Sequence, residues 1–415
     1  MNAKLDPSHH AWMIEPRTRA VIDVLTKNGG AARFVGGAVR NALLGEAVGD
    51  IDIATPLVPE EVMQRLQAAR LGAVPTGIEH GTVTAVSGGK PFEITTLRRD
   101  VETFGRRAVV AYTTDWAQDA ARRDFTINAL YAGDDGAIFD YFDGLADLAA
   151  RRVRFVGDAT TRIREDYLRI LRLFRFHAWY GRGDLDEEAL AAARAEQGGL
   201  KLLSGERVQR ELLRLLQAQE PSPALKQMEE AKILAQILPA GFRLPRLKRL
   251  VSVERKNSLP PDAVLRLAAL LPDGVPPALK IADALKLSNA ARDRLVQAGE
   301  KDERIVAALA PAEARQLIYR LGAACFLDQL LLRWAASGGR ANDAAWRGLL
   351  ALAMNWKAPV FPLNGNDVMA EGVEAGPKVG VLLRDIERWW VAQDFAPDRP
   401  ALLKRLKEAA RPPRA

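Results

Sequence analysis

Two aspartates in the N-terminal part of the chain are spaced to hold a metal ion. Asp50 and Asp52 stand in the run GDIDIAT, whose residues from Ile51 onward predict a strand. Because side chains alternate across a strand, both carboxylates would share one face while Ile51 and Ile53 point into a core. Neighbouring carboxylates repel each other unless a cation lies between them, and hard oxygen ligands of this kind suit Mg²⁺.

A glycine pair precedes these aspartates. Gly36 and Gly37 follow an apolar strand expected at residues 33–35 and precede a helix expected at residues 38–44. Paired glycines let backbone N–H groups approach an anion at the start of a helix, a common way to hold phosphate. An Asp-x-Asp pair alone is more often a solvated strand end. A phosphate cradle beside metal-binding carboxylates instead indicates nucleotide chemistry.

The order of these features over residues 34–55 resembles the signature of nucleotidyltransferases with the DNA polymerase beta-like fold. More narrowly, it is similar to the bacterial class II tRNA nucleotidyltransferase (CCA-adding enzyme) and poly(A) polymerase family. The resemblance implies that the two aspartates bind Mg²⁺ and that Gly36, Gly37 and Arg40 contact the nucleotide. The family usually has Arg-Asp after the glycine pair, whereas this chain has Arg40-Asn41, so the charge of that Asp is missing here.

A third carboxylate, Glu93, lies in a strand predicted over residues 91–97. Glu93 and Thr95 share one face of that strand, from which Glu93 could reach the aspartate pair on an adjacent strand. A half-exposed strand glutamate would produce the same pattern. The family carries a similar glutamate at this place, which implies a catalytic role.

The next stretch, residues 98–114, is polar and contains a glycine. It resembles the mobile loop of CCA-adding enzymes, although an ordinary surface loop would look similar. Its arginines could follow a triphosphate or a primer end: Arg98, Arg99, Arg106 and Arg107.

A second signature, ARRDFTINALY at residues 121–131, matches the family's Arg-Arg-Asp-Phe-Thr-x-Asn-Ala element. A guanidinium fork can grip phosphate oxygens while a nearby carboxylate accepts from ribose hydroxyls. The resemblance implies that Asp124 contacts the sugar, that Arg122 and Arg123 contact phosphates or stack, and that Asn128 holds the same loop or the ribose.

A third signature, IREDYLRILRLFRF at residues 163–176, predicts one helix on which Asp166 and Arg169 adjoin. Cytosine and adenine each present an amine donor beside an unprotonated ring nitrogen, and an Asp acceptor next to an Arg donor complements them. Uracil and guanine present the opposite pattern. The resemblance places Glu165, Asp166 and Arg169 in the family's Glu-Asp-x-x-Arg motif, which selects the base without a template. The same helix continues with two further nucleotide-binding candidates, Arg172 and Arg175.

The amino-acid composition limits which kinds of partner and which cell compartment fit this chain. The 415 residues carry a net charge of +7, which fits a polyanionic partner but also a merely basic protein. The single cysteine, Cys325, excludes a disulfide framework or zinc cluster within one chain and reads as a buried small hydrophobe. The four histidines lack metal-ligand spacing, so we expect no zinc. No apolar run is long enough to span a bilayer, so we expect a cytoplasmic protein without a membrane partner.

The pattern of elements predicts an α/β head followed by an all-α body. Strand-like runs occupy the first third, and Leu-, Ala- and Arg-rich helices follow it. We expect a catalytic head with the polymerase beta-like fold at residues 1–148, a helical neck for base recognition at 149–225, and a helical body and tail that bind tRNA at 226–415. Within the body, a basic cluster at residues 242–256 could contact RNA or simply face solvent.

The resemblance implies addition of CCA to tRNA 3′ ends from CTP and ATP, with Mg²⁺ as cofactor. A poly(A) polymerase would share the head, but we find no Gly-basic-basic-Phe signature between the catalytic and ribose motifs. A CC-only or A-only enzyme is a further alternative. A non-catalytic RNA-binding module is disfavoured, because such a module would have no need for the intact carboxylates and arginines described above.

Overall fold

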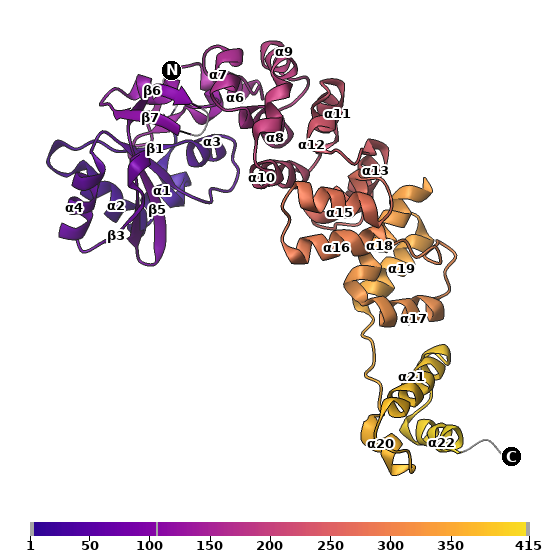
Figure 1. Ribbon diagram of the computed structural model, residues 1–415. Helices are drawn as coiled ribbons and strands as arrows, with labels where there is room; N and C mark the ends of the chain where they lie inside the picture. Colours follow the sequence, from indigo (N-terminus) through magenta and orange to yellow (C-terminus); the bar gives the residue numbers. More distant parts are fainter. Residues whose placement is uncertain (1–3, 105–106, 412–415) are drawn as a thin grey trace. The chain divides into compact units, whose positions relative to one another are not determined.

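The computed structural model describes residues 4–104 and 107–411, and the side chains of residues 100–110 lie outside the description. The chain forms two compact units, Met1–Pro239 and Ala240–Ala415. The first contains all the strands of the described chain together with the neck helices, and the second is helical (Figure 1). The predicted order, an α/β head followed by an all-α body, is confirmed.

A mixed sheet of seven strands forms the head, in the order β3-β4-β5-β2-β1-β8-β9. Its strands are β1 (Arg33–Val35), β2 (Asp52–Thr55), β3 (Gly72–Gly77), β4 (Thr82–Ser87), β5 (Lys90–Thr96), β8 (Tyr131–Ala132) and β9 (Ile138–Phe139). Side chains of β4 alternate regularly between buried and partly exposed, as the sequence pattern predicts. The central core contains Phe34, Ile53, Phe92 and Ile94, each at most 1% exposed.

The pairing of three strands brings the nucleotide-binding features together. Strand β1 runs antiparallel to β2, with Val35 opposite Asp52, so the glycine turn that follows β1 lies beside the start of β2. Strand β5 runs parallel to β2, with Glu93 opposite Asp52. The predicted reach of Glu93 from an adjacent strand therefore corresponds to the observed register.

Helices flank the sheet. They are α1 (Ala11–Ile14), α2 (Pro16–Thr26), α3 (Gly37–Leu43) and α4 (Pro59–Ala68), with short 3-10 turns at Pro7–His9, Lys27–Gly29 and Ile78–His80. The sequence pattern predicts a helix to residue 71, but α4 ends at Ala68 because Arg70 adopts a left-handed conformation with φ of 59°.

The polar stretch at residues 98–114 is not an irregular loop. Strands β6 (Arg98–Phe104) and β7 (Arg107–Tyr112) form a separate two-stranded antiparallel sheet. The run AVVAY at residues 108–112 favours β structure. The arginines and the glycine of the same stretch instead suggested a loop. Helix α5 (Trp116–Ala121) and a 3-10 turn (Thr126–Asn128) follow the hairpin.

The rest of the first unit, which includes the neck expected at residues 149–225, is helical. It comprises α6 (Gly144–Ala149), α7 (Ala159–Glu165), α8 (Leu168–Tyr180), α9 (Glu187–Ala195), a 3-10 segment (Gln197–Leu202), α10 (Gly205–Leu216), α11 (Ser222–Glu230) and α12 (Ile233–Ile237). The prediction of a single helix over residues 163–176 is wrong. The backbone of Asp166 is extended, with φ of −156°, and separates α7 from α8. Its carboxylate accepts from the backbone N–H of Leu168 at 3.1 Å, which favours a helix start over helix continuation.

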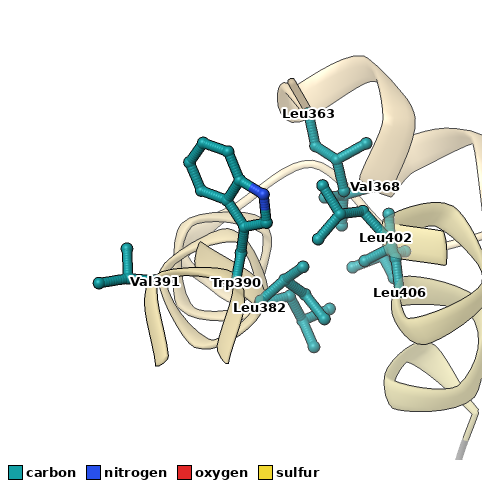
Figure 2. Close-up of a cluster of buried hydrophobic side chains, with 9 residues drawn as sticks. Leu363, Val368, Leu382, Trp390, Val391, Leu402 and Leu406 are labelled. Carbon is teal, nitrogen blue, oxygen red and sulfur yellow. The ribbon is translucent and has the colours of Figure 1, made fainter. Parts of the chain in front are cut away.

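The second unit contains ten helices within its described residues: α13 (Leu244–Lys256), α14 (Ala263–Leu270), α15 (Val275–Ala284), α16 (Asn289–Gly299), α17 (Pro311–Leu321), α18 (Ala323–Ser337), α19 (Ala344–Asn355), α20 (Gly365–Ala370), α21 (Pro377–Ala392) and α22 (Arg399–Ala410). The last three share a small apolar core, and Figure 2 shows Leu382, Leu402 and Leu406 gathered near Trp390. Cys325 is partly exposed, so its predicted burial is wrong: on α18 it falls outside the face that buries Phe326 and Leu330. Across the described residues, no helix is long and apolar enough to cross a membrane.

Candidate active site

The predicted carboxylates lie at and just before the start of β2: Asp52 is its first residue, and Asp50 precedes it. Ile51 and Ile53 are 2% and 0% exposed, whereas Asp52 is half-buried and Asp50 is exposed, so burial alternates over residues 50–53. The alternation does not continue through β2, because Ala54 is also buried. Burial, and then the nearby negative charge of Glu93, raise the pKa of Asp52 to about 6. Asp50 acts in the same direction, and only Arg123 opposes it. Asp52 thus lies where negative charge is crowded and a cation would be favoured.

These carboxylates suit a divalent cation whose remaining ligands come from the phosphates of the substrate and from water. In the part of the chain that the structure describes, no three carboxylate, histidine or cysteine side chains are grouped to form a complete metal site. Mg²⁺ is commonly held by only one or two carboxylates together with phosphate oxygens and water. Asp50 and Asp52 can supply those carboxylates, and Glu93 adds to the negative potential.

The glycine turn presses close to the second signature. Gly36 has φ of 68° and ψ of −122°, a conformation that a residue with a side chain adopts only with strain. A Cβ at Gly36 would lie 3.8 Å from Nη1 of Arg123. Gly37 opens helix α3, so its backbone N–H lies at a helix start. An anion bound here would meet backbone donors and a guanidinium together.

Arg40 lies in the interior rather than at the surface of this turn. It is 6% exposed and donates to Asn128 Oδ1 at 2.5 Å, to Tyr180 Oη at 2.8 Å and to Asn41 Oδ1 at 2.9 Å. Asn41 in turn donates to the backbone oxygen of Ala47 at 3.0 Å. The structure therefore places Arg40 as a buried link between α3, the second signature and α8.

Arg122 and Arg123 share one buried partner, Asp119. Its carboxylate accepts from Arg122 Nε at 2.7 Å, from Arg123 Nη2 at 3.1 Å and from Tyr131 Oη at 2.6 Å. Burial alone would raise the pKa of Asp119, but Arg123 and Arg122 hold it below its usual value. Sequence reasoning missed Asp119, although its place three residues before an Arg-Arg pair on a helix was a usable signal.

Asp124 is engaged with the neck. One of its oxygens accepts from Arg172 Nε at 2.8 Å, and the other from Asn128 Nδ2 at 3.1 Å and from the Phe125 N–H at 2.9 Å. Burial opposes ionisation, but the Arg172 guanidinium and the hydrogen bonds from Asn128 and the Phe125 N–H together hold the pKa of Asp124 well below its usual range. A ribose hydroxyl, predicted to bind Asp124, would have to donate to a lone pair of these oxygens that the protein donors do not use.

The third signature is arranged differently from the prediction. The side chains of Asp166 and Arg169 do not pair with each other, although the backbone N–H of Arg169 donates to the backbone oxygen of Asp166 at 2.9 Å. Asp166 Oδ2 instead accepts from Arg207 Nη2 at 2.7 Å. Arg169 forms an ion pair with Glu165 and donates to the backbone oxygen of Arg162 at 2.8 Å. The helix break is the physical reason, because the Asp166 carboxylate is used to accept from the Leu168 N–H at the new helix start and from Arg207.

Arg162 joins the second and third signatures. It donates to the backbone oxygens of Arg122 and Arg123, the latter at 2.8 Å, and forms an ion pair with Glu165. A cavity of about 500 Å³ opens beside this contact. Its lining comprises Arg99, Gln118, Ala121, Arg122, Arg162 and Glu165. One cavity thus combines the hairpin, the phosphate-binding candidates and the base-reading segment.

The remaining predicted residues fall into two groups. Arg175 is bound to Glu211 of α10, which also lies 3.8 Å from Arg172. Of the hairpin arginines, Arg98 donates to the backbone oxygen of His80, and Arg99 lines the cavity. Arg106 and the side chain of Arg107 lie outside the described part of the chain.

Comparison with known proteins gives consistent matches. Residues 32–154 match the poly A polymerase head domain, and residues 184–242 match the probable RNA and SrmB-binding site of polymerase A. The mitochondrial CCA tRNA nucleotidyltransferase 1 of Mus musculus is 34% identical over 407 residues, which cover 94% of this chain and 89% of the relative. The CCA-adding enzyme of Levilactobacillus brevis is 32% identical over 393 residues, covering 93% and 96%.

A solved structure agrees with these relatives. The Bacillus stearothermophilus CCA-adding enzyme in complex with CTP has a TM-score of 0.72 to this chain at 28% identity, covering 95% of this chain and 96% of its own. A Thermotoga maritima CCA-adding enzyme complexed with tRNA_CCA shares the fold, with a TM-score of 0.69. The chain belongs to the family of CCA-adding tRNA nucleotidyltransferases.

Proposed function

We propose that this enzyme adds C, C and A in turn to the 3′ end of tRNA, using CTP and ATP and no template. The observation that carries the proposal is that Asp50 and Asp52, at the start of β2, lie beside the Gly36 turn in a chain whose relatives match it over nearly their full length. The terminal tRNA hydroxyl oxygen bonds to the α-phosphorus of the nucleotide. The bond to the bridging oxygen breaks, pyrophosphate leaves, and the hydroxyl proton is released.

The residues of the head position these groups. We assign Asp50 and Asp52 to Mg²⁺, which when bound would activate the attacking hydroxyl and neutralise charge on the phosphates. The Gly36 turn and the Arg123 guanidinium would hold the triphosphate oxygens. Glu93 would keep the local potential negative, so that cation and triphosphate bind together.

Base selection is assigned to the break between α7 and α8. Asp166 is held by Arg207 and Arg169 by Glu165, so each side chain has an ordered partner before a nucleotide enters. The Asp166 carboxylate would accept from the amine of cytosine or adenine, and Arg169 would donate to the adjoining ring nitrogen. Uracil and guanine would place a carbonyl against the carboxylate and a donor against the guanidinium, which is unfavourable.

One observation favours a second candidate. The match of residues 32–154 to a poly A polymerase head domain would also suit an enzyme that adds only adenylate. The hairpin β6–β7, between the catalytic and ribose signatures, corresponds in position to the loop of CCA-adding enzymes and supports CCA addition over both poly(A) and CC-only synthesis.

The test uses purified protein, Mg²⁺ and two tRNA transcripts, one ending before CCA and one ending in CC. Each receives CTP, ATP, UTP or GTP singly and then CTP with ATP, and products are resolved to single nucleotides. We expect CCA on the first transcript, one A on the second, and arrest. A lengthening A ladder would identify a poly(A) polymerase, addition of only CC or only A would identify a partial enzyme, and no addition would contradict the proposal.

A further inference from the structure

Asp119 is a buried carboxylate at a junction of three elements. It is 1% exposed and accepts from Arg122, Arg123 and Tyr131, and from the backbone N–H of Arg98 at 3.2 Å. Arg98 is the first residue of β6, and Tyr131 begins β8 of the main sheet. One carboxylate therefore ties the base of the hairpin and a sheet strand to the arginine pair.

These contacts orient the Arg123 guanidinium. Its Nη2 donates to Asp119, and its Nε donates to Tyr131 Oη at 3.1 Å, while that hydroxyl itself donates to Asp119. The closed triangle fixes two of the three guanidinium nitrogens. The third, Nη1, lies on the side of Gly36, where the triphosphate is assigned.

We propose that Asp119 is a positioning residue for the triphosphate: it holds Arg123 against the glycine turn and Arg122 at the cavity beside it, and it couples their orientation to the base of the β6–β7 hairpin. The inference deepens the proposed function and rests on its placement of the triphosphate. Asp119 does not contact the nucleotide itself, because its oxygens are occupied by these protein donors and are shielded from solvent.

Asp119→Asn tests this role with little change of shape. The variant removes the charge and sets an amide donor against Arg123 or Tyr131, so the guanidinium is no longer fixed. Because phosphates and not bases are affected, Kd for CTP and for ATP should rise by the same factor, about tenfold or more. Kd for inorganic pyrophosphate should rise equally, and the preference for C and A over U and G should be unchanged.

Asp147→Asn is the matched control. Asp147 is 0% exposed and likewise holds two arginines and a hydroxyl, accepting from Arg152 at 2.7 Å, from Arg154 at 2.9 Å and from Thr126 at 2.6 Å. Thr126 belongs to the second signature, but neither Asp147 nor any of these three partners is assigned to the nucleotide. We expect its variant to lower Tm about as much as Asp119→Asn while leaving Kd for CTP and pyrophosphate unchanged.

Calorimetric titration of wild type and both variants with CTP, ATP and pyrophosphate measures these Kd values without turnover. Unchanged Kd values for Asp119→Asn, or equal increases in both variants, would overturn the inference. Should Asp119→Asn not fold, Tyr131→Phe breaks the same triangle and should raise the same Kd values in equal proportion; unchanged values there would also overturn it. Failure of the wild type to extend tRNA would instead refute the proposed function, whatever these Kd values are.

Discussion

At the scale of single residues, Arg40 is held in the interior by neutral groups: the amide oxygens of Asn128 and Asn41 and the hydroxyl of Tyr180. Burial lowers the pKa of Arg40, although Tyr180 and Asp124 partly oppose this. The Asn in place of the family's usual Asp therefore still accepts a hydrogen bond, but it supplies no charge to balance the guanidinium.

Asn41→Asp should stabilise the protein. A carboxylate facing Nε and Nη2 of Arg40 would form charge-assisted bonds, and the lost bond to Ala47 offsets part of the gain. We expect the free energy of unfolding to rise by about 1 kcal/mol at pH 7. Denaturant titration measures this, and a decrease would mean that the buried guanidinium is already satisfied by its neutral partners.

Asp166→Ala should change nucleotide choice more than it changes residual turnover. The variant removes the acceptor for the amines of cytosine and adenine but leaves the β2 carboxylates in place. We expect the ratio of kcat/KM for CTP over UTP to fall at least tenfold, the size of one hydrogen bond to a charged group. Full retention of C and A selectivity in single-nucleotide assays would show that Asp166 does not read the base.

Residues that act through sequence-local geometry were predictable. Glu93 lies opposite Asp52 as expected, whereas the shared face of Asp50 and Asp52 stays a prediction, because β2 begins only at Asp52. Asp119 and Arg207 were not recognised as partners of site residues. Asp119 was not recognised because an aspartate in a short polar helix is common. Arg207 contacts Asp166 from 41 positions away in the sequence, so only the tertiary fold brings the two together.

At the scale of elements, the packing of α8 against α10 depends on a buried charge. Glu211 of α10 is 6% exposed and binds Arg175, with Arg172 nearby, both on α8. Arg172 in turn holds Asp124 of the head. This chain of ion pairs connects the neck to the second signature.

Glu211→Ala should destabilise the first unit strongly, because it leaves the Arg175 guanidinium without its carboxylate acceptor and removes one of the two carboxylates beside Arg172. We expect a loss of about 3 kcal/mol in the free energy of unfolding, as for removal of one partner from a buried pair. Glu188→Ala, at an exposed glutamate of α9, should stay within about 0.5 kcal/mol of wild type. Equal stability of the two variants would show that α8 and α10 are held by apolar contacts alone.

Element types were predicted better than element limits. The helix break at Asp166 was missed because helical periodicity continues through the residues on both sides, and only the bond from the Leu168 N–H reveals the new helix start. The hairpin β6–β7 was missed because its charged residues resemble a loop. Both of these differences from the predicted elements lie at the candidate site. Functional sites are where the backbone most often departs from what local sequence patterns predict.

At the scale of the whole molecule, the net charge of +7 suits a polyanion. Not every arginine is available for it, however. Arg246, part of the basic cluster predicted to face RNA or solvent, is 8% exposed and donates to the backbone oxygens of Ala268, Ala269 and Leu271. Lys248 and Arg255 of the same helix are exposed. Composition therefore predicts the class of partner, but burial decides which side chains can reach it.

Affinity for tRNA should fall steeply with salt. If three or more phosphates are neutralised on binding, the association constant should drop roughly 40-fold between 50 and 200 mM KCl, from a slope of about −0.9 per phosphate. Filter binding over a KCl series measures the slope. An affinity independent of salt would contradict recognition through the RNA backbone.

The most direct test of the account is Asp52→Ala in the tRNA extension assay. Removing a half-buried carboxylate beside Glu93 relieves repulsion, so the variant should fold with a Tm no lower than that of wild type. We expect it to bind tRNA almost normally and to incorporate neither C nor A. Turnover close to that of wild type would contradict the assignment of the β2 carboxylates as the catalytic centre.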